Sequence, residues 1–218
     1  MSRLFCLLIG YCFGMIQCSF LFGKAKGVDL RKHGSGNLGT TNTLRTLGNA
    51  SGAIVLVLDA LKAAVAILVT WLIFGKEAGY YPLLILYTGF GAVLGHDYPF
   101  YLKFKGGKGV ACTVGLAICL DIRLVPIPLL TFILIVIFTH YVSLGSLMAY
   151  LMLFLNYVAM GQLGLITNDK PVLYESYILL FVMMLLAYWQ HFANIRRLTN
   201  HEERKTFLKK KKREENNE

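Results

Sequence analysis

Residues 95–110 read GHDYPFYLKFKGGKGV, a polar stretch between apolar runs at residues 80–94 and 110–120. Glycine lacks a Cβ, so a glycine-rich backbone can approach a ligand closely. Successive N–H groups in such a turn form a concave anion site, which lysines reinforce. The stretch therefore predicts a phosphate site. The alternative is a short basic loop whose positive charges only determine the orientation of the protein in the membrane. Its lysines and glycines are Lys103, Lys105, Gly106, Gly107, Lys108 and Gly109.

This stretch does not match the phosphate loop of nucleotide-binding proteins. Leu102 stands where the Walker A motif has its first glycine, and Gly109 stands where that motif has Ser or Thr. The sequence also contains no Ser-His-Asp arrangement, no HxxxxD acyltransferase signature, no carboxylate pair and no metal cluster. Hydrogen-bond donors recur instead, which suits reactions that depend on positioning and charge stabilisation.

The composition is that of a membrane protein. The 218 residues are 56% hydrophobic and 16% charged, whereas soluble domains carry roughly 25% charged residues. The net charge of +10 could suggest nucleic acid as a partner, but the charges lie in loops and in the tail. A basic surface that faces anionic lipid is the simpler explanation. The five cysteines form no CxxC motif and are expected to act as small apolar side chains.

Apolar runs divide the chain into membrane-spanning segments. A spanning helix needs about 20 apolar residues, and the run at residues 110–120 is short by this measure. It either borrows residues from the glycine-rich stretch or enters the membrane without crossing. No cleavable signal peptide is evident, so the first run is expected to be a permanent span. The runs lie at residues 4–22, 52–74, 80–94, 110–120, 124–139, 144–161 and 173–189.

We therefore expect an all-α integral membrane protein with about seven transmembrane helices. Lys and Arg are concentrated in the loops after the first and third runs and in the tail, whereas the opposite side holds only Arg3, Lys76, Arg123 and Lys170. The positive-inside rule then places these basic loops in the cytoplasm and the N-terminus outside. Residues 1–200 form one polytopic domain in this interpretation, and residues 201–218 form a charged cytoplasmic tail without a catalytic role.

The loop after the first run carries a second group of polar residues, GSGNLGTTNTLR at residues 34–45. A helix can begin near Thr41, and the N–H groups of a helix N-terminus hold anions. Arg45 would bind phosphate oxygens as a fork. A Gly/Ser/Asn loop that caps a helix is the alternative, but a cap needs only one such residue. The candidate donors are Ser35, Gly36, Asn37, Thr41, Asn42 and Arg45.

Two histidines stand at the ends of apolar runs. His96 opens the glycine-rich stretch and is a candidate donor or proton carrier, although a lone histidine is more often structural. His191 and Asn194 are spaced i, i+3, so they share one face of a helix. Within the second run, Asp59 and Lys62 have the same spacing and could simply neutralise each other. Ser143, between two later runs, could cap a helix or bind a ligand.

Taken together, these loops resemble one family, the acyl-phosphate glycerol-3-phosphate acyltransferases of bacterial inner membranes, called PlsY. GSGNLGTTN with Arg45 is similar to the family's GSGNxGATN motif, and GHDYPFYLKFKGGKGVAC is similar to GHxFPxFLxFKGGKGVAT. HFANIRRLTNHEE, at residues 191–203, resembles HxxNIxRLxxGTE and keeps Glu203. Departures from the family pattern are Thr40, Tyr98, Cys112 and His201. The resemblance runs from about residue 4 to residue 203.

The resemblance implies a reaction. An acyl group would move from an acyl phosphate to the 1-hydroxyl of sn-glycerol 3-phosphate, giving lysophosphatidic acid and inorganic phosphate. No cofactor, metal, acyl-CoA or acyl carrier protein would take part, and an enzyme that makes acyl phosphate is a possible partner. Ser35 and Arg45 would be essential polar contacts, and Lys105 with the Gly106–Gly109 loop would shape the phosphate site. Ser143, His191 and Asn194 would complete the pocket.

Two functions of other classes stay open. A transporter for a phosphorylated solute would place polar groups through the membrane depth and on both faces, whereas only Asp59 and Lys62 lie away from the basic side. A structural anchor would tolerate substitution in its loops, and the dense Gly, Asn and Ser usage argues against it. For the enzyme, direct attack by the glycerol hydroxyl is expected. A substrate phosphate oxygen would be the base, with His96 as the second choice.

Overall fold

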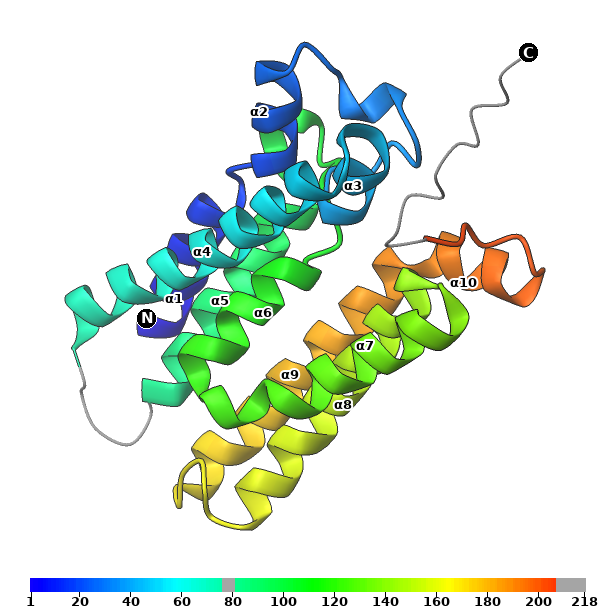
Figure 1. Ribbon diagram of the computed structural model, residues 1–218. Helices are drawn as coiled ribbons and strands as arrows, with labels where there is room; N and C mark the ends of the chain where they lie inside the picture. The colour runs from blue at the N-terminus through cyan, green and yellow to red at the C-terminus, as the bar shows by residue number, and fades with distance from the viewer. Residues whose placement is uncertain (76–80, 207–218) are drawn as a thin grey trace, which may run out of the picture.

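The computed structural model describes residues 1–75 and 81–206, and every regular element in these ranges is helical (Figure 1). Two stretches lie outside the described residues: residues 76–80, which include Lys76, and residues 207–218 of the tail. The α-helices are α1 (Ser2–Gly14), α2 (Cys18–Ala25), α3 (Thr40–Leu47), α4 (Asn49–Phe74), α5 (Tyr81–Asp97), α6 (Val110–Leu120), α7 (Pro126–Thr139), α8 (Val142–Gln162), α9 (Lys170–Gln190) and α10 (Phe192–Thr199). The short 3₁₀ helices are η1 (Leu30–Lys32), η3 (Phe100–Leu102) and η4 (Ile122–Leu124).

The predicted apolar runs are helical, which confirms the all-α prediction for the described residues. Five helical stretches there are long and apolar enough to cross a membrane: Ser2–Ala25, Asn49–Phe74, Ile122–Thr139, Val142–Gln162 and Lys170–Gln190. Helix α5 adds 17 residues. The count of about seven spans and the orientation stay predictions.

Helix α6 settles how the short fourth run is built. It begins at Val110 and has 11 residues, which corresponds to a length of about 16 Å against a hydrocarbon core of roughly 30 Å. Gly109 is its N-cap, so the glycine-rich stretch adds no helical residue to it. The chain then turns through η4 into α7. The idea that this run borrows residues from the preceding loop is therefore wrong.

The first predicted span is interrupted. Helix α1 ends at Gly14 and α2 begins at Cys18, with Gln17 as the N-cap of α2. Gln17 is fully buried, and its amide donates to the carbonyl of His96 at 2.7 Å. Through this hydrogen bond, the interruption of the first span is connected to the end of α5. Helix α2 then continues toward the basic loops.

Close packing of α1 on α5 depends on small residues. A Cβ added at Gly10 or Gly14 of α1 would collide with the backbone of Thr88 or Ala92 on α5. Added side-chain atoms at Gly91 and Gly95 would collide with the α1 backbone in the same way. Small residues allow helix backbones to approach closely where lipid supplies no hydrophobic driving force. This pair fixes the position of the C-terminal end of α5.

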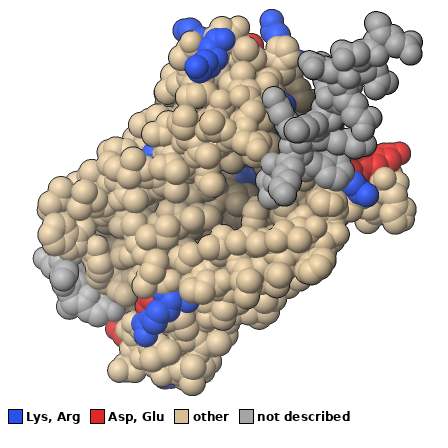
Figure 2. All heavy atoms as spheres, viewed as in Figure 1, with Lys and Arg blue, Asp and Glu red and all other residues tan. Residues whose placement is uncertain are grey.

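The core joins the two groups of helices that Figure 1 shows, α1–α6 and α7–α10. Its buried side chains come from α4, α5, α6, α8 and α9, and they include Ile67, Leu86, Leu116, Tyr157 and Met183. Large apolar side chains cover the outside, for example Phe138 at 79% exposed and Leu72 at 67%. Figure 2 accordingly shows a surface that is mostly free of charge along the helices. Such an exterior fits lipid as the surrounding medium.

The predicted polar loops gather at one end of the molecule. Helices α2 and α3 lie at the top in Figure 1 and α10 lies at the right, at the end of α9, whereas the α8–α9 turn lies at the lower left. The loop after α5 belongs to the same end as α2 and α3, because Tyr101 donates to the carbonyl of Met15 at 2.7 Å. Three stretches that are distant in sequence therefore meet where the helices end.

Candidate active site

The glycine-rich loop folds back onto the end of α5. The N–H of Gly106 donates to the carbonyl of Asp97 at 3.0 Å, and the N–H of Gly107 donates to that of His96 at 3.0 Å. A Cβ at Gly107 would collide with the His96 ring and with the Leu38 carbonyl, so glycine is needed for this close approach. These two N–H groups are occupied and do not form the anion site that the sequence predicts.

Free backbone donors lie slightly further along the chain. Gly109 has φ +69°, a conformation that favours glycine, and it turns the chain into α6. The first backbone bond of α6 runs from the Thr113 N–H to the Gly109 carbonyl at 2.9 Å. The N–H groups of residues 110–112 precede this bond and therefore lack an intrahelical partner. Donors suited to an anion are therefore offered by a helix N-terminus and the neighbouring lysines, and not by the N–H groups of Gly106 and Gly107.

A cleft of about 210 Å³ opens beside this loop. It joins the glycine-rich loop to Asn37 of the first polar loop and to Gln190 at the end of α9. Lys105 and Lys108 are among its lining residues. The residues that line it are Asn37, Asp97, Tyr98, Phe104, Lys105, Gly106, Gly107, Lys108 and Gln190.

Lys108 connects the cleft to α10. Its ammonium donates to the side-chain oxygen of Asn194, so the predicted pairing of the second and third motifs in space is observed. Burial lowers the pKa of Lys108 to about 8; the Glu203 carboxylate opposes this shift, and the positive charges of Arg197 and Arg45 add to it. Lys108 is therefore partly neutral in mildly alkaline solution.

Glu203 holds the polar side chains around it. Ser143 donates to Oε1 at 2.9 Å, Asn194 donates to Oε1 at 2.7 Å, and Arg197 donates to Oε2 at 2.7 Å. Burial raises the pKa of Glu203, but the hydrogen bonds from Asn194, Arg197 and Ser143 outweigh it, so the pKa lies below its usual value. Sequence reasoning gave this residue no role, although it stands in the third motif. It fixes the side chains of Ser143 and Asn194 in this structure.

Arg45 reaches the same region from α3. It donates to the Thr206 hydroxyl at 2.6 Å and to the Arg204 carbonyl at 3.2 Å. The N–H of Thr206 donates to the His140 carbonyl at 2.8 Å, which fastens this segment across the end of α7. Glu203 and Thr206 are buried. Packing thus continues past residue 200, beyond the expected start of the solvated tail.

The first polar loop is held by Asn42. Its amide donates to the carbonyls of Leu30 and His33, both at 3.1 Å, and its oxygen accepts from the Ser35 N–H at 2.8 Å. Asn42 is 2% exposed, so it positions the loop and does not present a donor to the cleft, which differs from the predicted substrate contact. Ser35 is exposed, and its hydroxyl accepts from the Asn37 N–H at 3.4 Å.

The remaining predicted residues of this loop frame α3. Gly36 has φ +73° and lies against the Arg31 carbonyl. Thr41 is half-buried in the first turn of α3. Neither lines the cleft, whereas Asn37, two residues after Ser35, does.

His96 lies behind the glycine-rich loop. It is 3% exposed, and its Nδ1 lies 2.9 Å from the Lys62 ammonium. Lysine has only donors, so Nδ1 accepts and the ring hydrogen is assigned to Nε2. Lys62 also pairs with Asp59 at 2.8 Å and donates to the Ile16 carbonyl at 2.7 Å. The predicted Asp59–Lys62 pair exists and contacts the His96 ring, which does not line the cleft.

His191 follows the end of α9 and is buried. Its Nδ1 lies 2.8 Å from the Ala187 carbonyl, so the ring hydrogen is assigned to Nδ1. Burial lowers the pKa of His191 to about 4, and the nearby Lys108 charge acts in the same direction. A neutral ring with Nε2 as acceptor is therefore the form present near pH 7.

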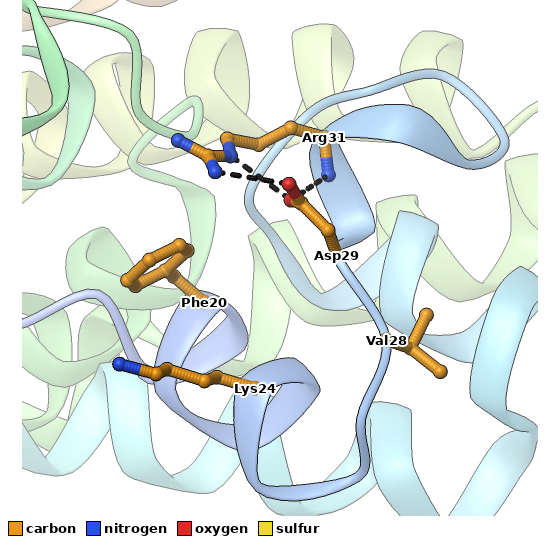
Figure 3. A pocket seen from close by; sticks show the side chains of 5 residues that line it. All are labelled: Phe20, Lys24, Val28, Asp29 and Arg31. Carbon is orange, nitrogen blue, oxygen red and sulfur yellow. Dashed lines mark hydrogen bonds and ion pairs between the residues drawn. The ribbon is translucent and has the colours of Figure 1, made fainter.

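A second hollow of about 220 Å³ lies apart from these residues, between α2 and η1 (Figure 3). Arg31 pairs there with Asp29 at 2.9 Å, and its guanidinium lies 5.1 Å from the centre of the Phe20 ring. Phe20, Lys24 and Val28 complete the lining. None of the predicted site residues lines it, so the cleft beside Lys105 and Lys108 is the stronger candidate.

Comparisons with known proteins show to which family the chain is similar. Residues 4–201 match the family model described as glycerol-3-phosphate acyltransferase. A glycerol-3-phosphate acyltransferase of Thermotoga petrophila is 40% identical over 203 residues, which cover 92% of this chain and 95% of the relative. One of Thermus thermophilus is 36% identical over 202 residues, with 91% and 92% covered.

Solved structures show the same likeness. A crystal structure of PlsY, an integral membrane glycerol 3-phosphate acyltransferase, in its glycerol 3-phosphate form has a TM-score of 0.81 and 33% identity, and the match covers 95% of this chain and 96% of that one. The lysophosphatidic acid form has a TM-score of 0.80 and 32% identity, with 95% and 97% covered. The chain therefore belongs to the glycerol-3-phosphate acyltransferase family of integral membrane proteins.

Proposed function

We propose that the protein transfers an acyl group from acyl phosphate to the 1-hydroxyl of sn-glycerol 3-phosphate, giving lysophosphatidic acid and inorganic phosphate. The observation that carries the proposal is the cleft in which Lys105 and Lys108 meet Asn37 and the N-terminus of α6. Cations and helix N–H groups at one place suit phosphate groups. Similar proteins carry glycerol 3-phosphate and lysophosphatidic acid in the descriptions of their structures.

The acyl donor enters from the bilayer in this proposal. Figure 2 shows a hollow in the surface between the two groups of helices, below the end where α3 and α10 lie, with basic atoms visible inside it. Apolar side chains exposed on α6, such as Val114 and Ile118, are available to an acyl chain at the outer surface. An acyl phosphate would thus keep its chain among apolar helices and its phosphate beside the lysines. Neither acyl-CoA nor acyl carrier protein is needed, and an enzyme that makes acyl phosphate is the expected upstream partner.

The chemistry is a direct displacement. The oxygen of the glycerol 1-hydroxyl forms a bond to the acyl carbon, the bond from that carbon to the phosphate oxygen breaks, and the hydroxyl proton moves to a phosphate oxygen. Phosphate is a good leaving group, so a strong protein nucleophile is unnecessary. Positive groups stabilise the carbonyl oxyanion and the departing phosphate. His96 is a poor choice of base, because its Nδ1 is engaged by Lys62 and its ring lies behind Gly107.

The membrane arrangement belongs to the same proposal. We place residues 1–200 as one multi-pass domain in the bacterial inner membrane, with the N-terminus outside and the cleft in the cytoplasm. The uneven distribution of Lys and Arg supports this orientation. Glycerol 3-phosphate would reach the cleft directly from the cytoplasm.

The deciding experiment measures phosphate release by the purified protein in lipid, with palmitoyl phosphate and glycerol 3-phosphate. Release should require both substrates and fall at least about 100-fold, or about 2.7 kcal/mol, in Arg45→Ala and in Lys105→Ala. Lys103→Ala is the matched control, because Lys103 is exposed and does not line the cleft. Release that survives both changes would contradict the placement of the site. Equal product formation from palmitoyl-CoA would contradict the choice of donor.

A further inference from the structure

Asp97 is an unpaired carboxylate in a cleft that is otherwise built for anions. It is the last residue of α5 and is 1% exposed. Neither of its carboxylate oxygens has a hydrogen-bond partner among the described residues. Gln190, which lines the same cleft, donates to the Gly107 carbonyl at 3.4 Å, and its side chain also lies near the Asp97 carboxyl group. A buried acceptor without a partner lowers the stability of the folded protein. We therefore expect Asp97 to have a functional role.

The surroundings of Asp97 limit what can bind it. It lines the cleft together with Lys105 and Lys108, which attract a phosphate group. A carboxylate repels phosphate but accepts hydrogen bonds from hydroxyl groups. A ligand that satisfies both ends of the cleft therefore carries a phosphate and, a few ångströms away, a free hydroxyl. Glycerol 3-phosphate has two hydroxyls, and the 1-hydroxyl must face the acyl carbon for the reaction proposed above.

We propose that the Asp97 carboxylate accepts a hydrogen bond from the 2-hydroxyl of the acceptor and thereby selects glycerol 3-phosphate over phosphomonoesters that lack this hydroxyl. The inference rests on the proposed function, because it assigns one hydroxyl of the same acceptor. A buried acceptor discriminates strongly, since an analogue without the hydroxyl leaves the carboxylate unpaired. Asp97 is thus a specificity-determining residue that touches the substrate.

A purely structural role makes a different prediction. Asp97 lies near the N-terminus of α6: a Cβ added at Gly109 would be 3.4 Å from its Oδ1. A carboxylate there also stabilises the positive end of the helix. In that case Asp97→Ala and Asp97→Leu would affect all acceptors equally, because the acceptor hydroxyl would not be involved. The two roles are therefore separable by comparing acceptors.

The experiment compares glycerol 3-phosphate with 3-hydroxypropyl phosphate, which lacks the 2-hydroxyl, using palmitoyl phosphate as donor. Wild type should favour glycerol 3-phosphate in kcat/KM by at least about 10-fold, which is about 1.4 kcal/mol. In Asp97→Leu and Asp97→Ala, which have no side-chain acceptor, this preference should shrink to less than about 3-fold. Asp121→Asn, at the start of η4 and outside the cleft, should keep the wild-type preference.

The outcomes separate the two proposals. No phosphate release from folded wild type with either acceptor would overturn the proposed function. Activity in wild type with an unchanged preference in both Asp97 variants would overturn the role of Asp97 and leave the proposed function standing. Thermal unfolding of each variant in detergent confirms that the compared proteins are folded. If Asp97→Ala does not fold, Asp97→Leu decides, since its side chain is similar in size and has no hydrogen-bond acceptor.

Discussion

The guanidinium of Arg45 donates to the hydroxyl of Thr206 at 2.6 Å, across 161 positions of sequence. This bond occupies a residue that the proposed reaction assigns to phosphate. Burial also lowers the pKa of Arg45, but the nearby Glu203 carboxylate opposes the shift. The segment after α10 therefore supplies the arginine with a neutral partner that a phosphate would replace.

The first prediction concerns this replacement. Thr206→Val removes the hydroxyl and keeps the shape of the side chain, so Arg45 should be easier to recruit by substrate. We expect the KM for glycerol 3-phosphate to fall about 5-fold with kcat unchanged, because one hydrogen bond of about 1 kcal/mol no longer competes. Steady-state phosphate release measures both constants. A rise in KM would show instead that Thr206 orients Arg45 for binding.

The second prediction concerns the charge of Lys108. Its pKa is lowered to about 8, so the side chain is protonated below that pH and neutral above it. If the charge binds phosphate, kcat/KM should decline as the pH rises through about 8. In Lys108→Arg the decline should disappear from this range, because arginine stays protonated. An identical alkaline limb in the two proteins would exclude Lys108 as its source.

The helices show what the sequence could establish. Apolar runs locate α4, α8 and α9 within a few residues, because hydrophobic length alone selects a spanning helix. The break between α1 and α2 was not visible in this pattern. Ile16 and Cys18, on either side of Gln17, are themselves hydrophobic. The partner of the buried Gln17 amide is the carbonyl of His96, which is 79 positions away and cannot be identified from the local sequence.

The candidate site shows the same limit. The family resemblance implied that the glycine-rich loop and Asn194 belong to one pocket, and the contact between Lys108 and Asn194 brings the two together. Motif spacing could not distinguish Asn42, which holds its own loop, from Asn37, which lines the cleft. Asn37 and Asn42 have the same side chain and lie in the same motif, so only the folded conformation of the chain determines which of them lines the cleft. Nor did the charged composition of the tail reveal that Glu203 and Thr206 are buried.

The third prediction concerns Glu203. Glu203→Ala removes the acceptor shared by Ser143, Asn194 and Arg197. We expect the free energy of unfolding to fall by about 2 kcal/mol, because buried donors are left without a partner. The Arg197 side chain is 36% exposed, so solvent screening limits its share of the loss. Phosphate release should fall at least about 10-fold, since Asn194 is no longer positioned.

Glu202→Ala is the control for this change. Glu202 is exposed beside Glu203, and surface substitutions usually change stability by less than about 0.5 kcal/mol. Thermal unfolding in detergent and phosphate release are measured on both variants. Equal behaviour of the two would mean that the network around Glu203 does not hold the site.

The last prediction concerns the close approach at Gly107. Gly107→Ala places a Cβ against the His96 ring and the Leu38 carbonyl, neither of which can move freely. The His96 ring is held by Lys62 at 2.9 Å, and Leu38 is 1% exposed. The loop must therefore shift away from α5, and Lys108 shifts with it. We expect phosphate release to fall at least about 100-fold. Gly39→Ala is the matched control, because its nearest neighbour would be the Asn37 amide at 3.4 Å, an ordinary contact. A Gly107→Ala protein with wild-type release would show that the packing of this loop on His96 is not what places Lys105 and Lys108 in the cleft.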